Sequence, residues 1–160
     1  MSVIEDAVSW AVEIAEDDSH GYDQGSRDGP NYDCSSLVSW AYYNAGLNTR
    51  PGYTPATGTM YSVYTEAGFV DVTDQVSMSS GSGMERGDVL LTPGSHTAMY
   101  IGDGDLVQAS QNELGGVTGG TSGDQTGNEI AVRSYYNFPW TYCLRYPENK
   151  ALSLVRWIPG

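Results

Sequence analysis

The chain is poor in cysteine, histidine and basic residues. Its 160 residues include two Cys, two His, two Phe and seven Lys or Arg against twenty Asp or Glu, which gives a formal net charge of −13. Two cysteines are too few for a disulfide framework, and two histidines far apart in the sequence argue against a catalytic zinc site. A nucleic-acid or anionic-membrane partner is not expected, because both require clustered positive charge. The length suits one domain with a substantial core.

Long apolar runs are also missing. No segment is long enough to span a membrane. The chain starts with Met1-Ser2-Val3-Ile4-Glu5-Asp6, which lacks the basic region and the apolar stretch of a secretory signal. Nothing in the sequence therefore predicts membrane insertion.

Cys34 begins the most informative segment. Polar residues surround it, and apolar residues then recur at helical spacing until Gly46, which is typical of an amphipathic helix followed by its stop signal. A cysteine in the first turn of a helix meets unpaired backbone N–H groups and the positive end of the helix dipole. Both favour the nucleophilic thiolate, so the position predicts a reactive cysteine. The alternative is a small buried apolar residue, as free cysteines often are.

His96 is the best candidate for a base that would activate this thiol. It begins a segment of alternating polarity, which predicts a half-buried strand, and the turn dipeptide Asp103-Gly104 leads into a second strand that carries Gln108. Cysteine, histidine and a polar orienting residue can form a catalytic triad. The alternatives are a structural histidine and a solvent-facing glutamine. His20 would compete as the base if the loop from Asp17 to Asn31 folded over Cys34.

The remaining patterns predict helices early in the chain and antiparallel strands late, which is an α+β fold with N-terminal helices packed on an antiparallel β-sheet. A long Gly- and Thr-rich loop is expected over residues 111–128, where function and disorder are both open. We expect helices over residues 4–16 and 59–67, besides the one that Cys34 begins, and strands over 69–72, 88–92, 129–134 and 142–146, besides the hairpin that carries His96 and Gln108.

These segments resemble the NlpC-type cell-wall cysteine peptidases, and among them most closely the bacteriophage endolysin amidase branch. The resemblance extends from about Ile4 to Tyr146. It implies a papain-like core that hydrolyses an amide bond of peptidoglycan. The segments that carry the resemblance are Arg27-Asp28-Gly29-Pro30, Tyr32 to Leu47, Arg86-Gly87-Asp88-Val89-Leu90, and His96 to Gln108.

The resemblance also implies a role for each candidate site residue. The catalytic residues would be Cys34 as nucleophile, His96 as base and Gln108 at the third, orienting position. Tyr22 matches a family tyrosine whose hydroxyl helps to bind the oxyanion, together with the backbone N–H of the cysteine. Asp33 and Ser35 match positions that shape the site and contact the stem peptide.

Several functions follow as expectations. The core family implies an endopeptidase that cuts between D-Glu or D-Gln and the diamino acid, and the phage branch also contains N-acetylmuramoyl-L-alanine amidases. Alternatives of another class are a protein-modifying cysteine acyltransferase or deamidase effector and a non-catalytic wall-binding module. The expected partner is bacterial peptidoglycan, and a monomer is expected.

The remaining expectations concern organisation. We expect a catalytic domain over residues 1–148 and a linker over 149–160 that leads toward a C-terminal wall-binding domain. Without a signal peptide, the protein would be made in a host cytoplasm and released to the wall, as a phage lysin is. No cofactor is expected, although an acidic loop could hold Ca²⁺, with a spacing that does not match an EF-hand. Its acids are Asp17, Asp18, Asp23 and Asp28.

Overall fold

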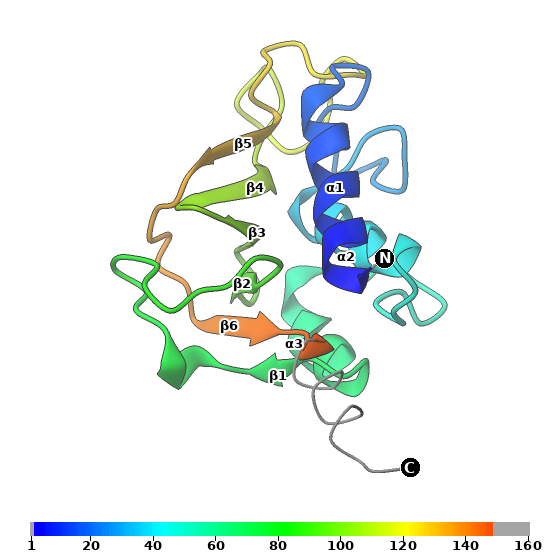
Figure 1. Ribbon diagram of the computed structural model, residues 1–160. Helices are drawn as coiled ribbons and strands as arrows, with labels where there is room; N and C mark the ends of the chain where they lie inside the picture. The colour runs from blue at the N-terminus through cyan, green and yellow to red at the C-terminus, as the bar shows by residue number, and fades with distance from the viewer. Residues whose placement is uncertain (1, 149–160) are drawn as a thin grey trace.

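A computed structural model describes residues 2–148 and shows helices packed on one face of a single antiparallel sheet (Figure 1). The sheet order is β1-β6-β2-β3-β4-β5. The predicted α+β class is therefore confirmed, whereas the predicted linker over residues 149–160 lies outside the described residues. The helices are α1 (Val3–Glu16), α2 (Cys34–Asn44) and α3 (Thr57–Glu66); the strands are β1 (Val70–Asp71), β2 (Val89–Thr92), β3 (His96–Gly102), β4 (Asp105–Ala109), β5 (Ile130–Ser134) and β6 (Tyr142–Arg145).

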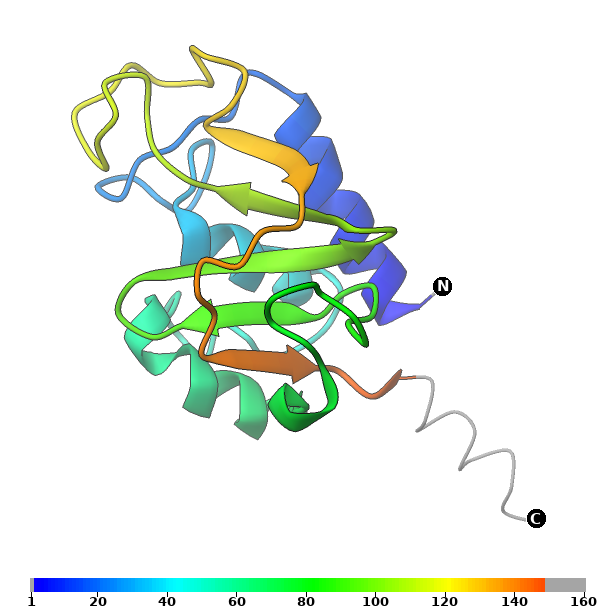
Figure 2. The same cartoon turned by 90° about the vertical axis from the view of Figure 1, so that its left-hand side faces the viewer.

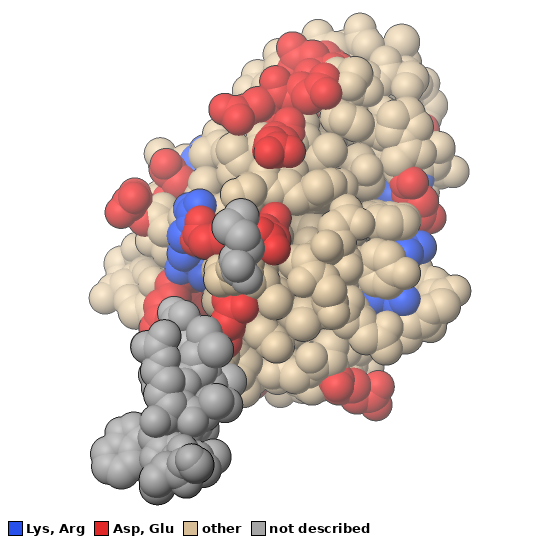
Figure 3. Space-filling view, turned by 45° about the vertical axis from the view of Figure 1, so that its right-hand side comes forward, with Lys and Arg blue, Asp and Glu red and all other residues tan. Residues whose placement is uncertain are grey.

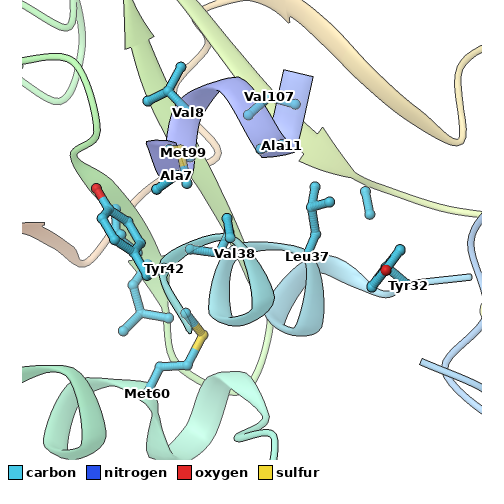
Figure 4. Packing of buried hydrophobic residues seen from close by; sticks show 14 of the residues in the cluster. Ala7, Val8, Ala11, Tyr32, Leu37, Val38, Tyr42, Met60, Met99 and Val107 are labelled. Carbon is cyan, nitrogen blue, oxygen red and sulfur yellow. The ribbon is translucent and has the colours of Figure 1, made fainter. Parts of the chain in front are cut away.

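The first helix begins directly after a capping serine, Ser2. The side chain of Ser2 accepts a hydrogen bond from the backbone N–H of Glu5, which satisfies one of the unpaired N–H groups of the first turn. Apolar side chains at helical spacing then pack against α2 and the sheet (Figure 4). The predicted helices agree with the structure to within two residues, and a 3₁₀ turn at Thr73–Gln75 was not predicted.

Alternation along the strands produces two apolar clusters, one on each face of the sheet. Met99 and Val107 face the helices, and Ala98 and Leu106 face the opposite side. The connection between β5 and β6, residues 135–141, runs across that opposite face (Figure 2). It contributes Trp140 to the second cluster. His96, two residues before Ala98, and Gln108, two residues after Leu106, lie on this same face beside the crossing segment.

The hairpin between β3 and β4 has the predicted two-residue turn. Asp103 and Gly104 have φ values of 54° and 80°, and Gly102 pairs with Asp105 on either side of them. Positive φ at both turn residues matches the twist of the flanking strands. A register shift between Tyr100 and Gly102 then sets Met99 opposite Val107, so that Gln108 faces the same side of the sheet as His96.

Charge is unevenly balanced on the surface. Acidic side chains outnumber basic ones on the face shown in Figure 3. Arg27, Arg86 and Arg145 form ion pairs with carboxylates. No helix within residues 2–148 is long and apolar enough to cross a membrane.

Candidate active site

Cys34 is the first residue of α2, as predicted. Asp33 caps the helix: its carboxylate accepts a hydrogen bond from the N–H of Ser36 at 2.8 Å, while the Ser36 hydroxyl accepts one from the N–H of Asp33 at 2.9 Å. This reciprocal capping box fixes the first turn of the helix. The cysteine is therefore held by local sequence at a defined position.

The thiol environment differs from the expectation that the helix start favours a thiolate. Burial raises the pKa of Cys34 to about 11, and the negative charge of Asp33 adds to the effect. Hydrogen bonds from the backbone of Thr97 and Ser35 act in the opposite direction, as does Arg27, but they do not outweigh burial. That expectation was wrong because the sequence pattern does not reveal how completely the thiol is removed from water. The resting cysteine is a neutral thiol.

His96 and Gln108 are hydrogen-bonded to one another. The distance from His96 Nε2 to Gln108 Oε1 is 2.8 Å, and both side chains are buried. Since a carbonyl oxygen only accepts, Nε2 carries the ring proton and Nδ1 keeps a free lone pair. Burial lowers the pKa of His96, although the bond to Gln108 opposes this shift. The imidazole is therefore neutral near pH 7 and able to take a proton through Nδ1.

Several contacts bring Cys34 to the start of β3, where His96 lies. The backbone of Thr97, the residue after His96, lowers the pKa of the Cys34 thiol, and helix α2 packs against β3. A cavity of about 260 Å³ is lined by Cys34 together with Gly94 and Ser95, which immediately precede the histidine. The structure thus brings the predicted nucleophile and the predicted base to the same end of the sheet.

Tyr22 lies close to the thiol. Burial raises the pKa of Tyr22 to about 12, and the charge of a Cys34 thiolate is the next largest cause. The phenol oxygen accepts a hydrogen bond from Gln24 Nε2 at 3.2 Å, and the backbone N–H donates to Glu129 Oε1 at 2.9 Å. A phenol can accept this hydrogen bond and still donate its own proton, so the Tyr22 hydroxyl can act as a donor near Cys34.

Asp33 and Ser35 line the cavity and also bind Arg27. Arg27 Nε donates to Asp33 Oδ2 at 2.6 Å and Nη2 donates to Ser35 Oγ at 2.7 Å. The Ser35 hydroxyl in turn donates to Asp33 Oδ1 at 3.1 Å. Arg27 also donates to the backbone carbonyls of Thr54 and Pro55. This arginine was not singled out as a functional residue from the sequence, and it neutralises the carboxylate next to the nucleophile.

The long loop over residues 111–128 is tied to the loop that carries Tyr22. Asn31 Oδ1 accepts hydrogen bonds from the N–H groups of Gly21 and Gly123, at 3.0 and 3.1 Å. Asp124 N donates to the carbonyl of Asp18 at 2.7 Å. These contacts support the position of Tyr22.

His20, the aspartates of the acidic loop and Cys143 do not line the cavity beside Cys34. His20 Nδ1 lies 2.6 Å from the carbonyl oxygen of Pro30, and the cavity beside Cys34 is lined without it. In the described part of the chain, no three His, Cys, Asp or Glu side chains are grouped as a metal site requires. The acidic loop makes internal contacts instead: Asp28, for example, accepts hydrogen bonds from Trp40 and Thr54. Cys143 is buried and, like Cys34, forms no disulfide.

Tyr136 makes a contact with Gln108 that was not predicted from the sequence. The hydroxyl of Tyr136 donates to Gln108 Oε1 at 2.7 Å. Phe138 and Trp140 pack against the imidazole of His96, with ring centroids 5.1 and 5.7 Å away. Nothing in the sequence distinguishes Tyr136 from the other tyrosines, although the aromatic run around it is conspicuous.

Solved structures similar to this chain carry NlpC/p60 domains. The resuscitation promoting factor interacting protein RipA, mutated at a histidine, matches with a TM-score of 0.56 and 18% identity over 90% of this chain and 62% of that one. The P60 domain of an antigen from M. avium subspecies paratuberculosis matches with a TM-score of 0.51 and 18% identity, over 91% of this chain and 95% of that one. RipD from Mycobacterium tuberculosis, described as a non-catalytic NlpC/p60 domain protein, matches with a TM-score of 0.52 and 19% identity. The match covers 91% of this chain and 98% of the RipD chain.

These structural matches establish the fold. This chain spans 62% of the RipA chain that it matches. No curated protein matches it in sequence. A sequence-family model described as the endolysin-like domain matches residues 29–107 and 106–156, which together make up most of the chain. The match includes Cys34 and His96. The protein is therefore a member of the endolysin-like domain family, built on the fold of NlpC/p60 domains.

Proposed function

We propose that this protein is a peptidoglycan hydrolase that cleaves an amide bond of the stem peptide through Cys34. The observation that carries the proposal is the neutral, buried His96, which is bonded to Gln108 through Nε2 and lies at the end of the sheet where the Cys34 thiol is found. Membership of the endolysin-like family and the NlpC/p60 fold support a bacterial cell-wall substrate.

The first chemical step forms an acyl-enzyme. As Cys34 Sγ attacks the amide carbon, its proton moves to Nδ1 of His96, so the thiol is activated only when the nucleophile is needed. The developing oxyanion would be bound by the Tyr22 hydroxyl and the N–H of Cys34, which has no helical acceptor in the first turn. His96 then gives the proton to the leaving nitrogen as the carbon–nitrogen bond breaks.

The second step releases the product and restores the site. Water attacks the thioester carbon while Nδ1 of His96 takes a proton from that water. The sulfur leaves and recovers the proton from the imidazole, so Cys34 returns to its neutral thiol. Gln108 orients the imidazole throughout but contributes no negative charge, because its side chain is a neutral amide.

We place the cut between D-Glu or D-Gln and the diamino acid, in line with the core of the resembled family. Digestion of purified cell walls of several chemotypes, with mass spectrometry of the released fragments, tests this. New free amino groups on the diamino acid are expected from the wild type and not from Cys34→Ala. Free amino termini on L-alanine would instead establish the N-acetylmuramoyl amidase.

A wall-binding role without catalysis is the second candidate, because the structurally similar RipD is described as non-catalytic and adapted to peptidoglycan binding. The two candidates differ in what Cys34→Ala changes. A binding module would sediment with walls equally well before and after the substitution and release no fragments in either form. Activity on proteins alone would point to the acyltransferase or deamidase alternative.

A further inference from the structure

Tyr136 makes a contact that the proposed mechanism does not yet use. Its hydroxyl lies 2.7 Å from Gln108 Oε1, and the same oxygen lies 2.8 Å from His96 Nε2. The amide oxygen therefore accepts two hydrogen bonds, one through each lone pair. Tyr136 reaches this position from the segment that crosses the face of the sheet opposite α1 and α2 (Figure 2).

Tyr136 contacts Arg133 and Trp140, whose ring centroid lies 5.8 Å from that of Tyr136. The guanidinium carbon of Arg133 lies 4.0 Å from the centre of the ring, and Trp140 Nε1 donates to the Tyr136 carbonyl at 2.9 Å. Trp140 also stacks against His96, with ring centroids 5.7 Å apart. The hydroxyl thus projects from a packed aromatic group that contacts the imidazole directly, so its position relative to Gln108 is well defined.

A primary amide can turn by 180° and exchange its oxygen with its NH₂ group. With the oxygen toward His96, Nε2 carries the proton and Nδ1 is free to act as a base. With NH₂ toward His96, Nε2 would have to accept, the ring proton would move to Nδ1, and the base would be lost. The turned amide could still donate to the Tyr136 oxygen, but the Tyr136 O–H would lose Gln108 Oε1, the one acceptor that it has among the described residues. The hydroxyl therefore favours the orientation that catalysis requires.

We propose that Tyr136 is a positioning residue that acts through Gln108 to keep Nδ1 of His96 free of its proton. This inference rests on the proposed function, since a free Nδ1 matters only if His96 serves as the base for Cys34. Tyr136 itself touches neither the imidazole nitrogen nor the reacting carbon in this scheme. Removal of its hydroxyl should lower kcat by about tenfold, the factor that corresponds to one neutral hydrogen bond, and leave KM nearly unchanged.

Tyr136→Phe tests the proposal because it removes the hydroxyl and keeps the ring that contacts Arg133 and Trp140. The neighbouring Tyr135→Phe is the matched control, since the Tyr135 hydroxyl donates to the carbonyl of Met78 and not to the triad. We expect the first substitution to reduce kcat on purified walls and the second to leave it unchanged. An unchanged kcat in Tyr136→Phe, or an equal loss in both variants, would overturn the proposal.

A cycle with Gln108→Ala separates positioning from general damage to the fold. If Tyr136 acts through Gln108, its substitution costs about tenfold in the wild-type background and almost nothing once Gln108 is gone. The same loss in both backgrounds would mean a role independent of Gln108 and would reject the inference.

The imidazole tautomer gives a readout that needs no turnover. Nitrogen-15 NMR of the histidine ring should show the proton on Nε2 in the wild type and a larger population with the proton on Nδ1 in Tyr136→Phe. An unchanged tautomer population would count against the proposal. If the wild type releases no wall fragments while the tautomer still shifts, the proposed function fails and the positioning role of Tyr136 stands.

Discussion

Replacement of Arg27 by alanine should destabilise the whole domain, because Arg27 is a partly buried cation that donates to several acceptors. Its guanidinium makes four hydrogen bonds, to Asp33, Ser35 and two backbone carbonyls. The Arg27 side chain is 20% exposed and that of Asp33 only 9%. Removal of the arginine leaves a buried carboxylate without its counter-charge at the start of α2.

The size of the effect follows from what Asp33 retains. Loss of one partner from a buried ion pair costs about 3–5 kcal/mol, and we expect the lower end, about 3 kcal/mol, because Ser35 and Ser36 still donate to Asp33. For a domain of this size, that corresponds to a drop in Tm of roughly 6–12 °C. Urea unfolding and thermal unfolding by circular dichroism measure the two quantities.

Arg86 provides the control for this prediction. It forms an ion pair with Glu5 in which both side chains are nearly half exposed, at 44% and 49%. Such exposed pairs contribute up to about 1 kcal/mol, so Arg86→Ala should change stability far less than Arg27→Ala. A loss below about 1 kcal/mol for Arg27→Ala would refute the view that the Arg27 network holds the first turn of α2.

Three further predictions follow from the same geometry. The kcat/KM for wall hydrolysis should fall as the pH drops through the lowered pKa of His96, below its ordinary value of 6.5, and remain high into mildly alkaline solution because the pKa of Cys34 is raised to about 11. A midpoint of the acidic limb at or above pH 6.5 would contradict the lowered pKa of His96. Tyr22→Phe should lower kcat by about 10²-fold through loss of an oxyanion donor, and an unchanged initial rate would remove Tyr22 from that role. Gly21→Ala should lower Tm strongly, since a Cβ there would lie 2.1 Å from the carbonyl oxygen of Gly123. As a control, the Cβ of Gly58→Ala in α3 would meet nothing within 4 Å, so this variant should be neutral or stabilised by up to about 1 kcal/mol. Equal Tm values for the two variants would argue against the close approach of the loops.

Local sequence patterns predicted the helices and strands of the fold well, and they named Cys34, His96 and Gln108 as candidates for the site. Ser2 and Asp103-Gly104 act through hydrogen bonds and φ values within a few residues, and for that reason a single sequence reveals them. The Asp103-Gly104 turn also placed Gln108 on the strand next to His96. The register shift between Tyr100 and Gly102, which brings both side chains to one face of the sheet, was not predicted. The features that were predicted depend on neighbours in the chain.

Tertiary features were not predicted because they depend on residues far apart in the sequence. Arg27 reaches backbone carbonyls at Thr54 and Pro55, and Tyr136 reaches Gln108 from 28 residues away. The neutral state of Cys34 depends on burial beneath several segments, which overrides the helix start that the sequence displays. No periodicity reports contacts of this kind.

The central claim is that Cys34 forms a covalent acyl-enzyme with the wall peptide. Mass spectrometry of the protein, mixed with a synthetic stem peptide and quenched in acid, tests it directly, with Cys143→Ala as the control for the other buried thiol. The account predicts an acyl adduct on the peptide that contains Cys34, in the wild type and in Cys143→Ala, and neither adduct nor hydrolysis in Cys34→Ala. Hydrolysis by Cys34→Ala at the wild-type rate would contradict it.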